Sequence, residues 1–144
     1  MTTRLDIDGA RQALRNLGSG PVDASVLARY RELPVLLRRT GLIATLATVL
    51  SRGSRSGTGP AYTAVADALA VVIAVALHRP AGSTPADLLV ALTEAGPADY
   101  IAAARRADHM LLWLKRLAEA RHHATPGKPR TTQASAVEPT TEDA

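Results

Sequence analysis

The sequence predicts an all-α protein: a compact bundle of about six helices in a single domain over residues 1–124, followed by a disordered polar tail over 125–144. The apolar content comes from Ala, Leu and Val, while aromatic residues make up 3% of the chain and Phe is absent. Sandwiches and barrels favour β-branched and aromatic residues in alternation, whereas here the apolar residues recur at helical spacing. Prolines and glycines divide the chain into segments of helical length.

The size and composition limit the class of protein. A chain of 144 residues suits one domain and can bury about two-thirds of its unfolded surface. The absence of cysteine excludes disulfides and thiolate metal sites and agrees with the reducing cytoplasm, where we expect the protein to act. The start of the chain lacks the apolar stretch of a signal peptide, and the longest apolar run, 68–77, is shorter than the roughly 20 residues that cross a bilayer. We therefore expect no membrane partner.

Two helices are predicted before residue 41. The first ends at Gly18, and its apolar residues share one face that we expect to be buried. The second begins near 23–25 and reaches Pro34, where we expect a kink or a break and a short new segment with proline at its first position. The apolar face of the first helix consists of Ile7, Ala10, Leu14 and Leu17.

Gly41 allows a sharp change of direction into a third helix, which is apolar over most of its circumference and is expected to be central. A basic loop over 51–60 carries Arg52 and Arg55. Pro60 suits the first turn of a fourth helix, which reaches about His78 and is almost wholly apolar.

The second half of the chain predicts two more helices. Thr84, Pro85 and Asp87 fit the N-cap, first and third positions of a short helix that closes at Gly96. Pro97 opens the longest helix, which runs to about His123 and has a basic outer face opposite its apolar one. That apolar face consists of Tyr100, Ala103, Ala107, Leu111, Leu114 and Ala118, with Met110 and Leu117 at its margin.

The patterns that carry catalysis are missing. The four histidines form no H-E-x-x-H motif and have no carboxylate at zinc-ligand spacing. The segment RGSRSGTGP lacks the Lys-Ser/Thr of a P-loop, and no G-x-S-x-G elbow or pair of carboxylates on one face occurs. We therefore predict a protein that is not an enzyme and that uses no metal or cofactor.

The charge instead favours an anionic partner. The net charge is +4 with a pI near 10.1, and arginine, whose planar guanidinium suits phosphate, supplies most of it. The tail carries two basic and three acidic residues, so the body has fifteen and ten, a net charge of +5. Two interpretations remain open for these arginines: solvated helix ends and faces, or a surface that follows phosphates. Trp113 could likewise stack on a base or lie at the margin of the core.

Two blocks resemble a known family. The stretch YRELPVLLRRTGLIATLATVLSRG, residues 30–53, is similar to the LP-x-x-x-x-x-x-GL-x-x-x-LA pattern of the small α-helical subunit, the fifth Cmr protein, of type III-B CRISPR RAMP effector complexes. The stretch YIAAARRADHMLLWLKRLAEA, residues 100–120, resembles the closing helix of that family, with its W-L-K-R-x-A-E-A ending. A phenylalanine that is common in the family is here Thr48.

The resemblance implies a non-catalytic scaffold subunit for antiviral RNA interference. Such a subunit stacks in more than one copy, associates with the other Cmr subunits, and contacts the duplex of guide RNA and target RNA. Phosphate contact needs no base code, since the guide already reads the target. The residues that would then contact RNA are Arg38, Arg39, Arg52, Arg55, Arg105, Lys115 and Arg116.

Two other functions are compatible with a small helical protein. One is a helix-turn-helix DNA-binding regulator whose recognition helix is the third helix, although that helix offers only Thr45 and Thr48 as polar readers of bases. The other is a helical adaptor that binds proteins and no nucleic acid.

Overall fold

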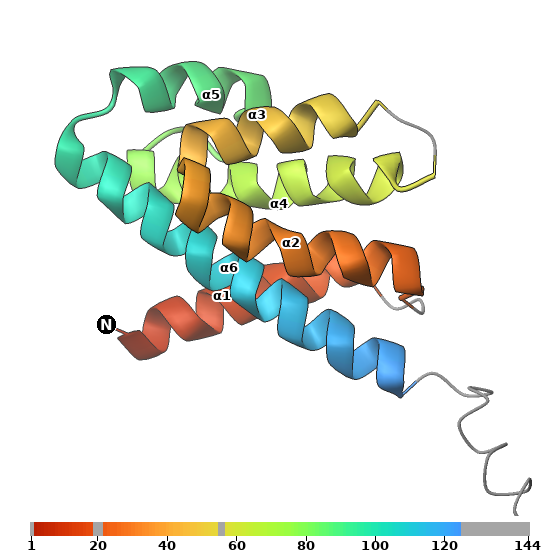
Figure 1. Ribbon diagram of the computed structural model, residues 1–144. Helices are drawn as coiled ribbons and strands as arrows, with labels where there is room; N and C mark the ends of the chain where they lie inside the picture. The colour runs from red at the N-terminus through yellow and green to blue at the C-terminus, as the bar shows by residue number, and fades with distance from the viewer. Residues whose placement is uncertain (1, 19–21, 55–56, 125–144) are drawn as a thin grey trace, which may run out of the picture.

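The computed structural model describes residues 2–18, 22–54 and 57–124, with the side chains of residues 2–6 left out. This part of the chain is all-α, as predicted, and contains no strand (Figure 1). The predicted tail, 125–144, lies outside the described residues. The helices are α1 (Thr2–Leu17), α2 (Ala24–Thr40), α3 (Leu42–Arg52), α4 (Gly59–Leu77), α5 (Pro85–Glu94) and α6 (Pro97–His123).

The centre of the bundle is formed by α4 and α6. Helix α6 crosses the molecule diagonally in Figure 1 and packs against α1, α2 and α4, while α4 also packs against α3 and α5. The prediction that the third helix is central was therefore wrong. Although α3 buries Leu42, Leu46 and Val49 completely, it has only 11 residues and packs mainly on α4, α2 and α5.

Helix α1 buries a different face from the one predicted. Ile7 and Leu14 are 49% and 47% exposed, whereas Ala13 is fully buried. A Cβ atom on Gly9 would lie 3.3 Å from the backbone carbonyl carbon of His109, so α1 and α6 approach closely where α1 has its small residues. Close backbone approach selects small side chains at the contact and leaves the large ones at its flanks.

Helix α2 continues without a break through Pro34, so the predicted new segment at this proline does not exist. A proline in a helix interior removes one backbone hydrogen bond and costs about 3 kcal/mol. Here Leu33, Pro34 and Leu37 are all buried, and this tertiary packing offsets the local penalty.

Gly41 makes the predicted corner between α2 and α3. Its φ of 92° lies in the region that glycine favours, and its amide donates to the Leu37 carbonyl at 2.9 Å. The amide of Leu42 then donates to the Tyr100 hydroxyl at 3.2 Å. The corner is thereby attached to α6.

The boundaries predicted for the later helices are confirmed. The Thr84 hydroxyl accepts from the Asp87 amide at 3.1 Å, and α6 runs from Pro97 to His123. The predicted apolar face of α6 is buried, with Tyr100 and Leu117 half-buried at its edges.

Helix α4 is longer and more apolar than the run 68–77 suggests. Among the described helices, it is the one with the length and composition to cross a membrane. More than half of its most apolar 18-residue stretch, 56%, is buried within the bundle. This burial is that of a core helix.

Candidate functional site

The two flanks of α6 are occupied by ion pairs to neighbouring helices. On one side, Arg31 Nε of α2 lies 2.8 Å from Glu119 Oε2. On the other, Arg106 Nη1 lies 3.8 Å from Asp8 Oδ2 of α1. Glu119 and Arg106 of α6 are therefore engaged by α2 and α1.

A depression of about 400 Å³ lies where α2 ends, α3 begins and the first half of α6 passes. We call it the corner depression. Arg38 is 62% exposed, and its Nε lies 3.5 Å from Asp108 Oδ1. Arg105 is exposed and has no ion-pair or hydrogen-bond partner in the described part of the chain. The lining residues are Leu37, Arg38, Gly41, Leu42, Tyr100, Ile101, Ala104, Arg105 and Asp108.

A second depression, of about 540 Å³, lies beside α2 toward α3. Arg39 is exposed on its rim and makes no ion pair or hydrogen bond with the residues that the structure describes. Adjacent arginines of α2 thus reach two neighbouring depressions. The lining residues of this second depression are Arg31, Glu32, Val35, Leu36, Arg39, Thr40 and Arg52.

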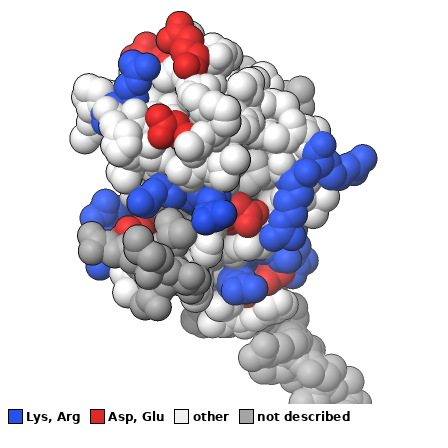
Figure 2. All heavy atoms as spheres, turned by 90° about the vertical axis from the view of Figure 1, so that its left-hand side faces the viewer, with Lys and Arg blue, Asp and Glu red and all other residues white. Residues whose placement is uncertain are grey.

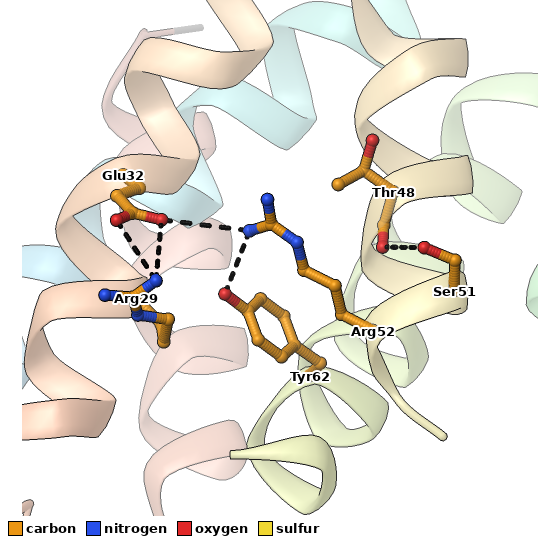
Figure 3. Close-up of polar contacts among 6 residues, drawn as sticks. All are labelled: Arg29, Glu32, Thr48, Ser51, Arg52 and Tyr62. Atoms are coloured by element: carbon orange, nitrogen blue, oxygen red, sulfur yellow. Dashed lines mark hydrogen bonds and ion pairs between the residues drawn. The ribbon is translucent and has the colours of Figure 1, made fainter. Parts of the chain in front are cut away.

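Arg52 makes several contacts within the bundle, and these hold its guanidinium more firmly than is expected for a side chain that binds phosphate. Its Nη1 donates to the Tyr62 hydroxyl at 3.1 Å and lies 3.8 Å from Glu32 Oε1, and its guanidinium lies 5.5 Å from the centre of the Tyr62 ring (Figure 3). Arg29 holds the same Glu32 carboxylate at 3.3 Å. Arg52 is 32% exposed and joins α2, α3 and α4.

The other predicted residues lie apart from the corner depression. Arg116 is exposed, with its guanidinium 6.0 Å from the centre of the Trp113 ring, and Lys115 is half-buried. Both are about 15 Å farther along α6 than Arg105, at a rise of about 1.5 Å per residue. Arg55 lies outside the described residues.

Sequence analysis missed two charged residues that line these depressions, Arg31 and Asp108. Arg31 lies two turns before Arg38 on α2, and this helical spacing is a signal that could have identified it. Asp108 has no such signal in the sequence, because its position beside Arg38 depends on how α2 packs against α6.

Figure 2 shows basic side chains in a band across the middle of the face that lies to the left in Figure 1. Acidic side chains are interspersed in this band. Within the described ranges, no three His, Asp or Glu side chains gather in a way that could hold a metal ion. The chemistry that this face offers is therefore ionic contact and hydrogen bonding.

A family model described as CRISPR-associated protein (Cas_Cmr5) matches residues 19–121, well over half of the chain. The chain belongs to the Cmr5 family. A Cmr5-family protein is a subunit of a CRISPR Cmr complex and has the other subunits as partners. No curated protein and no solved structure matches the chain.

The Cmr5 match extends from just before α2 to the last turn of α6, so it contains both depressions. The structure gives no support to a helix-turn-helix regulator. Thr45 is fully buried, and its hydroxyl donates to the Gly41 carbonyl at 2.8 Å. A recognition helix needs such a side chain free to reach bases.

Proposed function

We propose that this Cmr5-family subunit is a non-catalytic cytoplasmic scaffold that stacks in more than one copy and contacts the backbone of the guide–target RNA duplex. The observation that carries the RNA contact is the corner depression. There, two helices far apart in the sequence place Arg38 and Arg105 together, and Arg39 lies on the adjoining rim.

These arginines suit phosphate because they are exposed and weakly engaged. The pair between Arg38 and Asp108 is long and partly solvated, and such ion pairs contribute about 0–1 kcal/mol. A phosphate can therefore compete for Arg38, whereas Arg39 and Arg105 have no ion-pair or hydrogen-bond partner among the described residues to exchange. Contacts of this kind are independent of sequence, and each neutralised phosphate releases counterions.

The proposal predicts the effect of reversing these charges. Replacing Arg38 and Arg39 with Glu, or Arg105 and Arg116 with Glu, should weaken binding of target RNA by the assembled Cmr complex. The slope of log affinity against log salt concentration should also become shallower, by about one for each lost phosphate contact. Fluorescence anisotropy across a salt series measures both quantities, and circular dichroism checks that helicity is retained.

Arg79→Glu is the matched control, because Arg79 is exposed in the α4–α5 connection and lines neither depression. It should leave the salt slope unchanged. Unaltered RNA affinity after reversal of all four arginines would contradict the RNA contact. If the same variants failed to join the complex, the surface would instead bind protein, as an adaptor requires.

The number of copies is a separate part of the proposal. Native mass spectrometry of the assembled complex should give a mass that contains at least two copies of this subunit. A mass with a single copy would contradict stacking and would leave the RNA contact unaffected.

A further inference from the structure

Asp108 is an unexpected residue on a surface proposed to hold phosphates. A carboxylate repels phosphate, and this one is 31% exposed beside Arg38 and Arg105 in the corner depression. Its Oδ1 atom is covered and makes no hydrogen bond, since Arg38 Nε lies 3.5 Å away. In contrast, Glu119 is hydrogen-bonded to Arg31 at 2.8 Å. Because Oδ1 is covered, the exposed part of the carboxylate is Oδ2, which accepts no hydrogen bond from the described residues and is the oxygen that a ligand can reach.

The charged residues that line the corner depression define which kind of ligand could donate a hydrogen bond to Asp108. An ionised carboxylate only accepts hydrogen bonds, so the ligand must bring a donor to Asp108. Because Arg38 and Arg105 line the same depression, the ligand should also carry anionic oxygens close to that donor. The lining also includes Tyr100 and Ile101, so part of the depression suits a part of the ligand that has no charge.

The RNA backbone has this combination of groups. Each ribose carries a 2′-hydroxyl, which can donate, between two phosphates. In an A-form duplex these hydroxyls line a wide, shallow minor groove that proteins reach from outside. A backbone that lacks the hydroxyl keeps the phosphates and loses the donor.

We propose that Asp108 accepts a hydrogen bond from a ribose 2′-hydroxyl in the corner depression, so that this subunit selects RNA over an equally charged backbone without that hydroxyl. The inference rests on the proposed function, because Arg38 and Arg105 must hold the flanking phosphates. Asp108 adds the selectivity that arginines alone do not provide.

The test compares two A-form duplexes of the same sequence, one of RNA and one with 2′-fluoro groups in place of every 2′-hydroxyl. Fluorine preserves the sugar conformation and charge but cannot donate a hydrogen bond. The full chain should bind RNA more tightly, by about ten- to a hundredfold for a hydrogen bond to a charged group. In Asp108→Ala, the ratio of the two dissociation constants should fall close to one. Titrations followed by backbone amide NMR detect weak binding.

Glu119→Ala is the matched control. It removes the same charge and also breaks an ion pair between α2 and α6, but Glu119 does not line the corner depression. This variant should tighten binding to both duplexes by the same factor and leave their ratio unchanged. Circular dichroism confirms that both variants are folded.

Each alternative has its own outcome. Equal binding of both duplexes by the unmodified chain overturns the inference. If Asp108→Ala weakens both duplexes equally, the carboxylate only positions Arg38; if it strengthens both equally, the carboxylate only repels phosphate, and either result also overturns the inference. Failure of the proposed function looks different, because the unmodified chain would then bind neither duplex or would bind both unchanged after Arg38→Glu.

Discussion

Arg39 and Arg52 lie on the same depression but differ in their contacts. Arg39 extends into solvent, whereas Arg52 combines a hydrogen bond and a ring contact to Tyr62 with an ion pair to Glu32. A cation held at several points loses those contacts if it turns toward a phosphate. We therefore assign Arg52 to the stability of the bundle and Arg39 to its surface.

This assignment predicts different effects of alanine at the two positions. Arg52→Ala should lower the free energy of unfolding by about 1–2 kcal/mol, because it leaves the Tyr62 hydroxyl and Glu32 without this partner. Arg39→Ala should change it by less than about 0.5 kcal/mol, as is usual at exposed positions. Urea unfolding measures both, and equal losses would remove the distinction.

Sequence analysis named Arg39, Arg52 and Arg55 together as candidate RNA contacts but could not separate their roles. Arg52 and Arg55 have the same loop context in the sequence. What distinguishes Arg52 is the approach of Glu32 from α2 and Tyr62 from α4, 20 and 10 residues away along the chain. Such contacts depend on helix packing, which one sequence does not reveal.

At the scale of helices, the N-cap of α2 carries a titratable group, the carboxyl of Asp23. Asp23 Oδ1 accepts hydrogen bonds from the Val26 amide at 2.9 Å and the Ser25 hydroxyl at 3.0 Å. These bonds, the backbone one above all, hold the pKa of Asp23 below its ordinary value of 3.8. The ionised carboxylate therefore stabilises the first turn of α2.

The lowered pKa sets the direction of a pH dependence. The unfolded chain binds a proton at Asp23 at a higher pH than the folded chain does, so its contribution to stability is complete above the ordinary pKa and is lost as the pH falls through the folded value. Asp23→Asn retains a capping group without the titration. The difference in free energy of unfolding between the two proteins should shrink from about pH 5 to about pH 3. A difference that is constant over this range would contradict the assignment.

Helix boundaries were predicted correctly where the sequence signal acts within one turn of the helix. Pro97 fixed the start of α6, and the Thr84 cap fixed that of α5, because both act within one turn. Pro34 misled for the opposite reason, since burial of the surrounding helix overrides its local preference. The buried face of α1 was missed because close contact with α6 selects Gly9, and Ala13 is fully buried in place of the largest apolar side chains.

For the molecule as a whole, α1 raises a question about the boundaries of the domain. The family match begins at residue 19, after this helix, yet α1 packs along α6 and its Ala13 is fully buried. The packing indicates that α1 is part of the folded unit. Without it, buried residues of α6 would face water.

Removal of residues 1–18 should therefore lower the thermal midpoint strongly or abolish cooperative unfolding, because domain stability is only about 5–15 kcal/mol in total. Removal of residues 125–144, which we predict from their composition to form a polar tail, should leave the midpoint unchanged. Scanning calorimetry of the two truncated chains provides the comparison. Cooperative unfolding at an unaltered midpoint after loss of residues 1–18 would contradict the role of α1.

The contact between Arg116 and Trp113 allows ligand binding at this end of α6 to be followed by tryptophan fluorescence. Trp113 is the sole tryptophan of the chain, and it is half-buried, with the guanidinium of Arg116 6.0 Å from its ring centre. Indole emission responds to nearby charge and solvent. An anion that draws Arg116 away from the ring therefore alters the native fluorescence, and occupancy of this end of α6 can be followed in the unlabelled protein.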